Sequence, residues 1–594
     1  MARTASPAAA RGAGPLAGLR TEWPGPPGPG AGVVAGQLRL LGAEGGPGRG
    51  GHVALSGAEF GEVSVRTAWG KAEGVTDEAT VQAATGVMAV HGRRDGAPRG
   101  LAVDYAATAA GVLAVQALLA ALLAQARGTR GRFAHAEVSA ERAGLLAVSQ
   151  YLAAAGADEG EAVELAPGGP PFTSGDGVVF ELEALEPGGW AAFWRALGAP
   201  EEAVRRGWRP FQFRYATACA PFSDALHQVV RACMWERIKA AADAAGADVC
   251  PLHALTRRAA EDDGAPPWTL TPHGEGRTAT TSSGLDAPLA GLTVLEAGRR
   301  IQAPLAAHLL GLLGAEVVRI EPPGGDPLRG MPPACSGISA RWLALNRGKK
   351  AVEVDIKSPA DRGRLHEMAG DADVFLHNWA PGKAAALGLD REHLAAAHPG
   401  LVYAYTGGWA DRIPGAPVGT DFMVQARTGV GEAARPADEQ PAPSLMTLLD
   451  VLGGLLGAQS VLAALLLRER TGRGVRADSS LLGAADLLTA PARARAVRGE
   501  PPRRPAGYRR PLPTRDGGIA PADTCADAVA ARYARHRLAR ASTAEALARL
   551  HAHGLTATAV TTDLAGLPRD PRFAGLIRHD AHGSLAVPDP WRFA

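Results

Sequence analysis

The 594-residue chain has only five cysteines, and none belongs to a Cys-x-x-Cys pair or has a histidine at metal-ligand spacing. This scarcity argues against a disulfide framework and against a zinc site. Net charge is also small, because 62 basic residues face 60 acidic ones, so no nucleic-acid partner is indicated. We therefore expect a protein of the reducing cytoplasm that binds no metal.

Long hydrophobic runs are missing as well. The longest apolar stretch, residues 454–467, is too short to span a bilayer, and the N-terminus has no apolar core of the signal-peptide type. Both absences predict a soluble protein without a membrane partner. Glycine (75 residues) and proline (45) are abundant, and residues 1–60 have a composition typical of an irregular or partly disordered N-terminal segment.

An internal repeat organises the rest of the chain. VQAATGV at 81–87 matches VQARTGV at 424–430, and GVLAVQALLAALL from residue 111 matches GLLGAQSVLAALL from residue 454. Both pairs have the same separation, since 424 − 81 and 454 − 111 both equal 343. A shared separation is not expected of two chance matches. The chain is therefore predicted to consist of two fused copies of one unit, the first of which has lost its front half.

The repeat and the linker composition between its copies predict the domain boundaries. In chain order we expect the N-terminal segment 1–60, a degenerate first copy at 61–272 (the back half of a large domain plus a small domain), a linker at 273–288, the large domain of the second copy at 289–504, its small domain at 505–575, and a tail at 576–594 that returns to the large domain.

The second copy alternates strand and helix patterns. GLTVLEAG is typical of a strand and loop, PLAAHLLGLLGA of a helix, and EVVRIE of the next strand, followed by the short β-branched runs AVEVDI, VFLHN and LVYAYT. This alternation predicts an α/β fold with a largely parallel, Rossmann-like sheet. The Gly-x-Gly-x-x-Gly fingerprint is missing after the first strand, which disfavours NAD or FAD. Arg299 and Arg300 follow that strand near a helix N-terminus and could attract phosphate; solvated loop arginines are an equal alternative.

Four features occur in a fixed order: GAEVVRIEPPGGDPLRG, LNRGKKAVEVDIKSP, ADVFLHNWAPG, and an aspartate 21 residues before TGRG (471 − 450 = 21). Together they resemble the family III CoA-transferases, the CaiB/BaiF group. The resemblance covers nearly all of 289–594 and, more weakly, 61–272. It implies a Rossmann-like large domain, a small α+β domain and chains that interlock as dimers. For a fused tandem it implies an intramolecular pseudo-dimer, with a homodimer as the alternative.

The resemblance assigns the covalent nucleophile to Asp450. A carboxylate can form a mixed anhydride with an acyl group and then a thioester with CoA, without a metal. The backbone amides of Gly453 and Gly454 are expected to lie open to a developing oxyanion. An aspartate that only caps the following helix is the alternative. At the equivalent position of the first copy (450 − 343 = 107) the residue is alanine, with Asp104 three residues away, so one active site is expected, in the second copy.

The remaining site residues are also implied by the resemblance. Lysine and arginine suit the phosphates of CoA, and a tryptophan could pack on its pantetheine or adenine. Each position could equally be an ordinary surface or core residue. The expected CoA or substrate contacts are Gln302, Ala303, Arg329, Lys357, Asn378, Trp379 and Asp421. CoA and acyl-CoA are expected as substrates, with no permanently bound cofactor.

These residues are compatible with three functions. The expected one moves CoA from an acyl-CoA to a carboxylic acid through an aspartyl mixed anhydride and an aspartyl-CoA thioester. A related acyl-CoA racemase or isomerase would need a histidine before the aspartate of the Gly-x-Asp segment, where this chain has Thr420. A non-catalytic CoA-binding scaffold is the third. The glycine-rich loop of formyl-CoA transferases is not visible, which puts formate and oxalate in doubt, and no motif fixes the acyl donor or acceptor.

Overall fold

The computed structural model describes residues 14–594 except 47, 275–283, 506 and 534–537. Most of the expected linker therefore lies outside the described residues. The predicted fold class is confirmed: both copies are built on sheets with parallel strand pairs, and each copy carries a small three-stranded domain. The second copy contains the complete large domain.

A seven-stranded sheet forms the second copy, in the order β13-β10-β9-β14-β15-β16-β8. The first six strands are parallel to their neighbours, and β8 is antiparallel to β16. In chain order the strands are β8 (Trp268–His273), β9 (Thr293–Ala297), β10 (Glu316–Glu321), β13 (Lys350–Glu353), β14 (Val374–His377), β15 (Val402–Gly407) and β16 (Gly474–Ser480).

Helices cover both faces of this sheet, because successive strand residues point to opposite sides. Val374 packs into the core with the long central helices, whereas Phe375 packs with the helices of the other face. One layer contains α12 (Gln302–Leu312), α19 (Leu448–Thr471) and α20 (Leu481–Val497); the other contains α14 (Pro359–Asp371), α15 (Lys383–Ala386) and α16 (Arg391–Ala397). The shorter α13 (Ala340–Asn346), α17 (Asp421–Arg427) and α18 (Val430–Ala433) complete this copy.

The first copy has a smaller sheet, in the order β1-β2-β3-β4-β22. Its parallel pair β3 (Val63–Ala68) and β4 (His135–Ser139) corresponds to β15 and β16 of the second copy. The strands before that pair are antiparallel, so the parallel front half of the unit is missing here. The helices are α1 (Ala31–Leu40), α2 (Glu78–Ala84), α3 (Val87–His91), α4 (Tyr105–Ala126), α5 (Ala140–Ala147) and α6 (Ser149–Ala155).

The expectation of an irregular N-terminal segment is wrong for residues 14–60. They form β1 (Arg20–Glu22), α1 and β2 (His52–Ser56), and α1 packs on α4. Glycine permits this close packing: a Cβ on Gly30, whose φ is 70°, would lie 2.4 Å from the carbonyl oxygen of Ala107. The glycine-rich composition thus marks close backbone contact as well as turns.

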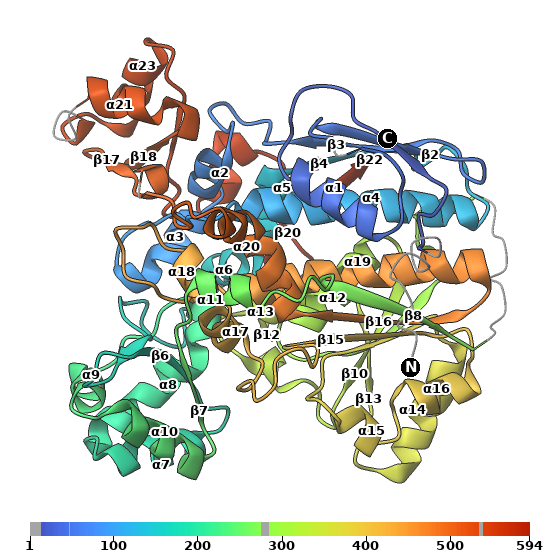
Figure 1. Cartoon of the computed structure of the whole chain (residues 1–594), viewed down its shortest axis with the longest axis horizontal. Helices are drawn as coiled ribbons and strands as arrows, with labels where there is room; N and C mark the ends of the chain where they lie inside the picture. The colour runs from blue at the N-terminus through green and yellow to red at the C-terminus, as the bar shows by residue number, and fades with distance from the viewer. Residues whose placement is uncertain (1–13, 47, 275–283, 506, 534–537) are drawn as a thin grey trace, which may run out of the picture.

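The two copies exchange their C-terminal strands (Figure 1). Strand β8 ends the first copy but joins the second copy's sheet beside β16, and β22 (Trp591–Phe593) ends the chain but pairs with β4. The tail at 576–594, predicted to return to the large domain of its own copy, instead joins the large domain of the first copy, because β22 pairs with β4. Each exchanged strand has a buried tryptophan: the indole N–H of Trp268 donates to Gln37 Oε1 at 2.8 Å, and that of Trp591 to the carbonyl oxygen of Leu113 at 2.9 Å.

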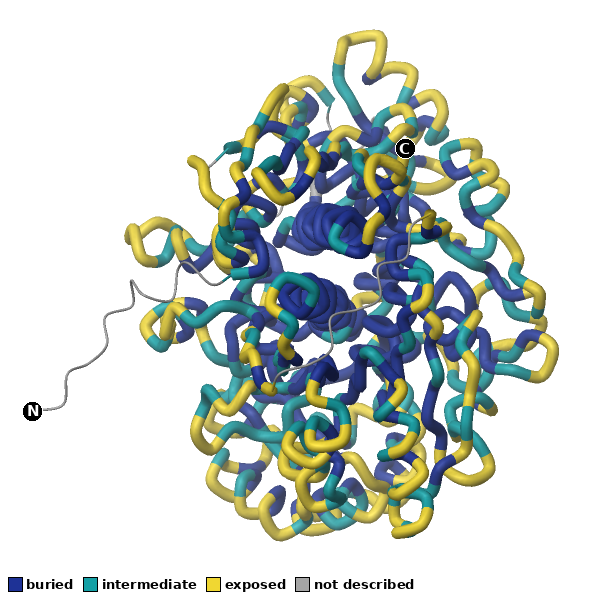
Figure 2. Tube along the Cα trace, turned by 90° about the vertical axis from the view of Figure 1, so that its right-hand side faces the viewer, coloured by how far each residue is buried: buried dark blue, intermediate teal, exposed yellow. Residues whose placement is uncertain are grey.

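Helices α4 and α19 pack against each other at the centre, where Figure 2 shows the buried residues concentrated. The hydroxyl of Tyr105 donates to the carbonyl oxygen of Leu448 at 2.9 Å, between positions exactly one repeat apart, since 448 − 105 = 343. Both helices are long and apolar enough to cross a membrane, longer than the apolar run expected from the sequence. Their most apolar windows are 100% and 94% buried, however, so they form the protein's own core.

Each copy also has a small domain. That of the first copy contains β5 (Phe172–Thr173), β6 (Val179–Glu183) and β7 (Asp248–Pro251) with α7 (Pro187–Leu197), α8 (Glu201–Thr217), α9 (Asp224–Arg231) and α10 (Trp235–Ala245). That of the second contains β17 (Leu512–Pro513), β18 (Gly518–Pro521) and β19 (Ala557–Ala559) with α21 (Ala526–Arg532) and α23 (Thr543–His551). In Figure 1 the first small domain lies beside the sheet of the second copy.

Candidate functional site

A cavity of about 900 Å³ lies between the large domain of the second copy and the small domain of the first. The start of α19, with the partly buried Asp450, forms part of its lining. The second copy contributes residues 299–302, 377–382 and 405–411, most of 413–422, Thr447 and Asp450; the first copy contributes residues 183–186, Trp208, Gln212, Arg214 and Tyr215. The site is therefore built by both copies.

Asp450 is the third residue of α19 and is partly buried. The backbone N–H groups of Leu449 and Asp450 both donate to Oδ2 of Asp421, at 2.7 Å each. Asp421 therefore fills the role of a cap, and Asp450 lies inside the helix, which contradicts the alternative that Asp450 caps it. The Asp450 carboxylate accepts no hydrogen bond from the described residues, so its oxygens are available to a ligand.

Burial and nearby charges shift the pKa values of the Asp450 and Asp421 carboxyl groups. Burial, and then the negative charge of Asp421, raises the pKa of Asp450 well above its usual range, while the charge of Arg300 lowers it. Burial also raises the pKa of Asp421 to about 6. Two neighbouring carboxylates in a desolvated place compete for one negative charge. The nucleophilic, ionised form of Asp450 therefore depends on nearby positive charge.

The first copy repeats this arrangement without an aspartate at the position of Asp450. Glu78 stands at the position of Asp421 (421 − 343 = 78), and its carboxylate accepts from the N–H groups of Ala106 and Ala107 at 2.9 Å each. Gln82 donates to Glu78 as Gln425 donates to Asp421. Each of these hydrogen bonds in the first copy thus has an equivalent in the second copy, between residues 343 positions later. Ala107 occupies the position of Asp450.

Asp104, the aspartate of the first copy nearest in sequence to the position of Asp450, has different surroundings. It immediately precedes α4, and its carboxylate forms a two-point ion pair with Arg504, at 2.5 and 2.6 Å, next to Arg509 at 3.7 Å. These contacts hold the pKa of Asp104 below its usual value, although burial opposes them. A carboxylate held by two arginines is a poor nucleophile, because attack on a carbonyl would break its ion pairs.

The two glycines that follow Asp450 in α19 have a packing role. Gly453 and Gly454 lie in the interior of α19, so their amides belong to the helix and do not form the expected oxyanion site. A Cβ on Gly454 would lie 2.9 Å from the carbonyl oxygen of Gln302 and 3.0 Å from Leu305 Cβ. The glycines therefore let α12 approach α19 closely, which fixes the start of α12 beside Asp450.

Four of the seven expected contact residues line the cavity: Gln302, Asn378, Trp379 and Asp421. Asn378 holds the loop after β9, since its side chain accepts from the N–H of Arg299 at 2.8 Å and donates to the same residue's carbonyl at 3.0 Å. Trp379 is buried beside His377, with ring centroids 5.0 Å apart. These side chains shape one wall of the cavity.

The other three expected contacts do not line it. Ala303 is completely buried inside α12. Arg329 is held by Glu321, with Nη2 2.8 Å from Oε1, and its guanidinium lies 3.8 Å above the Trp342 ring. Lys357 is exposed on the loop before α14. Their contact with CoA stays a prediction.

The cavity wall that the first copy provides was not expected from the sequence. Glu183 accepts from the Thr420 hydroxyl at 2.8 Å and pairs with Arg214 at 3.0 Å, which ties the small domain of the first copy to the Gly-x-Asp segment of the second. Tyr215 lies beneath Arg300, whose guanidinium is 5.4 Å from the ring centre. No motif marks these residues; only the interlocked arrangement of a tandem pair could have indicated them.

Backbone strain is concentrated around the cavity. Of the six non-glycine residues with positive φ in the described chain, four line it: Arg300 (58°), Ala410 (52°), Asp411 (54°) and Thr447 (55°). Left-handed backbone costs free energy for residues with a Cβ, and it persists where the surroundings enforce it, often at functional sites.

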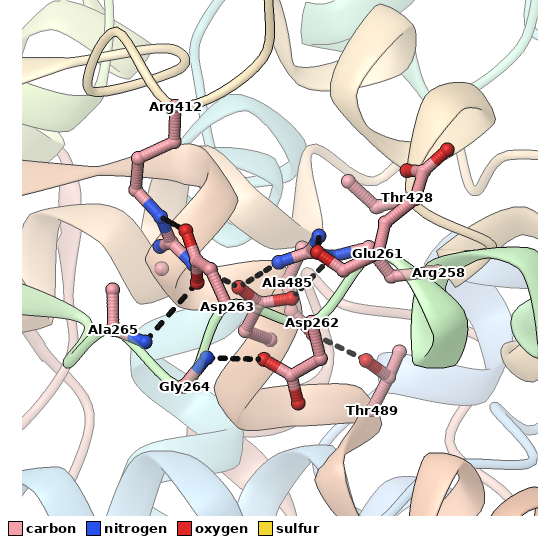
Figure 3. Close-up of polar contacts among 12 residues, drawn as sticks. Arg258, Glu261, Asp262, Asp263, Gly264, Ala265, Arg412, Thr428, Ala485 and Thr489 are labelled. Atoms are coloured by element: carbon pink, nitrogen blue, oxygen red, sulfur yellow. Dashed lines mark hydrogen bonds and ion pairs between the residues drawn. The ribbon is translucent and has the colours of Figure 1, made fainter.

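The cavity loop 408–420 is fastened to the end of the first copy (Figure 3). Arg412, in this loop, pairs with Asp263 through two contacts, and the same guanidinium lies 3.2 Å from Asp486 of α20. Arg258, on α11 (Leu255–Ala260), also pairs with Asp486, at 2.7 and 2.8 Å. The joint between the copies thus positions one rim of the cavity.

Comparison with known proteins identifies relatives of both copies. The family model described as CoA-transferase family III matches residues 60–266 and 289–550. Succinyl-CoA:glutarate CoA-transferase from Mus musculus is 35% identical over 198 residues, which are 33% of this chain and 45% of that protein. Acetyl-CoA:oxalate CoA-transferase from Acetobacter aceti is 35% identical over 207 residues, 34% of this chain and 53% of that protein. The chain thus spans about half the length of the curated relatives it matches.

Solved structures also match. A CAIB/BAIF family protein from Brucella suis is 26% identical; the alignment covers 52% of this chain and 93% of that protein, with a TM-score of 0.46. The two separate matches of the family model confirm the tandem arrangement expected from the repeat.

Proposed function

Because the chain belongs to CoA-transferase family III, we propose that it transfers CoA from an acyl-CoA to a carboxylic acid, with Asp450 as the covalent carrier. One observation carries the proposal: Asp450 presents to a cavity of about 900 Å³, formed by both copies, a carboxylate that has no hydrogen-bond partner among the described residues. The relatives described above are CoA-transferases, which supports the same reaction.

The proposed reaction begins with attack of an Asp450 oxygen on the thioester carbonyl of the donor. The C–S bond breaks, CoA leaves as a thiolate, and a mixed anhydride remains on Asp450. The thiolate then attacks the Asp450 carbonyl; the anhydride C–O bond breaks, which frees the donor acid and leaves an aspartyl-CoA thioester.

The second half reverses these steps with the acceptor. Its carboxylate attacks the aspartyl-CoA carbonyl and expels the CoA thiolate, which forms a new anhydride. The thiolate attacks the acyl carbonyl of that anhydride, so the product acyl-CoA forms and Asp450 regains its carboxylate. No metal, redox step or net proton transfer is required, and CoA acts as a substrate.

The test is intact-mass spectrometry after incubation with acetyl-CoA, succinyl-CoA and longer acyl-CoAs, followed by hydroxylamine or borohydride to trap the intermediates. We expect an adduct on the peptide that contains Asp450, and none in Asp450→Asn. Asp104→Asn is the matched control, because it changes an aspartate of the first copy near the equivalent helix start. An adduct that persists in Asp450→Asn would refute the proposal.

The isomerase alternative has a separate readout. The Thr420 hydroxyl, at the position of the base that a racemase requires, is bound to Glu183, so this residue offers no proton acceptor for an α-carbon. Incubation of each acyl-CoA in D₂O would reveal the alternative as deuterium at the α-carbon without an adduct on Asp450. CoA binding with neither signal would favour the scaffold.

We also propose that one chain is a complete functional unit, an intramolecular pseudo-dimer. The exchanged strands β8 and β22, and a cavity whose walls come from both copies, support this. Gel filtration with light scattering should then give the mass of a single chain. A stable homodimer would leave the role of the fusion to be explained otherwise.

A further inference from the structure

Five arginines line the cavity, and they differ in what occupies their guanidinium groups. Three are held in ion pairs: Arg214 with Glu183, Arg391 with Glu392, and Arg476 with Asp478. Arg299 and Arg300 form no ion pair among the described residues, and both are exposed. A guanidinium without a carboxylate partner keeps its N–H donors free for an anionic ligand.

Arg300 is the free arginine that lies close to the nucleophile. It follows β9 with φ at 58°, in the loop that Asn378 fixes through two hydrogen bonds to the neighbouring Arg299 backbone. Its guanidinium lies above the ring of Tyr215, and its positive charge opposes the rise in the pKa of Asp450 that burial and Asp421 cause. A strained backbone and an aromatic support thus hold a positive charge over one side of the cavity.

We propose that Arg300, supported by Tyr215 of the first copy, binds the reacting carboxylate of the acceptor beside Asp450. This role rests on the proposed function and gives the free guanidinium a ligand class, a carboxylate. It also gives the first copy a defined part in the reaction, because the ring that supports Arg300 comes from its small domain.

The chemistry explains why a positive charge is needed there. In the second half-reaction an acceptor carboxylate must approach a site that already holds the negative charge of Asp421. A bidentate contact from Arg300 would neutralise the acceptor and orient one oxygen toward the aspartyl-CoA carbonyl. The C–O bond then forms as the C–S bond breaks and the thiolate leaves. The same guanidinium faces the leaving carboxylate in the first half-reaction.

The experiment separates the two halves of the reaction in the full-length protein. Arg300→Gln and Arg300→Lys are compared with Arg299→Gln, which changes the adjacent free arginine; the Tyr215 ring lies beneath Arg300, and it is Arg300 whose charge acts on Asp450. Acetyl-CoA and succinyl-CoA are the donors, and acetate, succinate and glutarate are the acceptors. The KM of each substrate and the pH dependence of adduct formation are measured, with thermal unfolding as the check on folding.

For Arg300→Gln we expect the acceptor KM to rise about 10- to 100-fold, with the KM of the donor acyl-CoA nearly unchanged. Adduct formation should also need a higher pH, because loss of the Arg300 charge raises the pKa of Asp450. Arg300→Lys should restore the pH dependence and only part of the acceptor KM, since lysine keeps the charge but not the two-point geometry. Tyr215→Leu should raise the acceptor KM in the same direction.

Two outcomes would overturn the inference alone: an adduct on Asp450 with an unchanged acceptor KM in Arg300→Gln, or an equal rise in Arg299→Gln. If Arg300→Gln fails to fold, the Arg300→Lys and Tyr215→Leu results decide in the same way. Absence of any adduct in the unchanged protein would instead refute the proposed function itself, so the two failures are distinguishable.

Discussion

Replacing Asp421 with asparagine should change stability and chemistry separately, and the first copy offers a matched control. Asp421 caps α19 beside the proposed nucleophile, Asp450, whereas Glu78 caps α4 through the equivalent hydrogen bonds beside Ala107. Burial raises the pKa of Asp421 from 3.8 to about 6 and that of Glu78 from 4.5 to about 7. Asp421→Asn and Glu78→Gln remove these ionisations but keep an oxygen acceptor.

The stability effect follows from the direction of the pKa shifts. A carboxyl group whose pKa is higher in the folded state stabilises the fold below its unfolded pKa, and this contribution is lost as pH rises through the folded pKa. For Asp421 the loss falls between pH 3.8 and about 6, and for Glu78 between pH 4.5 and about 7. A shift of about two units corresponds to about 3 kcal/mol. Each variant should therefore unfold with a flatter pH dependence over its own window.

Only Asp421→Asn should change the chemistry. The charge of Asp421 raises the pKa of Asp450, so its removal should move the rise of adduct formation to lower pH. The assay is quenched-flow intact-mass spectrometry of the acyl-enzyme from pH 4 to pH 8, with denaturant unfolding over the same range. An unchanged pH dependence in Asp421→Asn, or an equal shift in Glu78→Gln, would refute the electrostatic account.

Three further outcomes are expected. Glu181 is fully buried, its carboxylate has no hydrogen-bond partner among the described residues, and burial raises its pKa to about 8. Glu181→Gln should therefore stabilise the fold by as much as about 5 kcal/mol above pH 8 and not at all below pH 4.5. Denaturant unfolding at a series of pH values measures this difference. Gly454→Ala should destabilise the fold by about 1–3 kcal/mol, because the added Cβ would collide with α12. Gly363→Ala is the control: it lies on an open face of α14 and should be neutral or stabilise the fold by up to about 1 kcal/mol. Thermal unfolding measures both. Ala107→Asp should still give one trapped adduct per chain in mass spectrometry, since the added carboxylate lies beside Asp104 and its two arginines; two adducts would show a competent second site.

The repeat was the most informative part of the sequence, because residues with the same separation in sequence occupy equivalent positions in the two folded copies. The distance of 343 positions that links two short motifs also links the caps of α4 and α19 and the contact from Tyr105 to Leu448. The alternation of strand and helix segments likewise predicted the parallel sheet, which the structure shows with helices on both faces. Family resemblance named five residues that line one cavity in the structure: Asp450, Asp421, Gln302, Asn378 and Trp379.

What the sequence could not predict depends on tertiary packing. The glycine-rich N-terminus looked irregular because composition does not show that Gly30 allows α1 to pack closely on α4. Gly453 and Gly454 resemble an open loop in isolation, yet they lie inside a helix against α12. Glu183, Arg214 and Tyr215 belong to the other copy, and nothing local connects them with Asp450. The cytoplasmic location stays a prediction.

The central claim is that Asp450 carries the reacting groups covalently, and oxygen-18 transfer tests it most directly. A carboxylic acid acceptor labelled in both carboxylate oxygens is turned over with its acyl-CoA donor, and the peptide that contains Asp450 is then analysed by mass spectrometry. The proposed anhydride leaves one acceptor oxygen on the Asp450 carboxylate after the thiolate attacks the acyl carbonyl. We predict that this peptide gains oxygen-18 while Asp104 and Asp421 do not. Turnover without label in Asp450 would contradict the account.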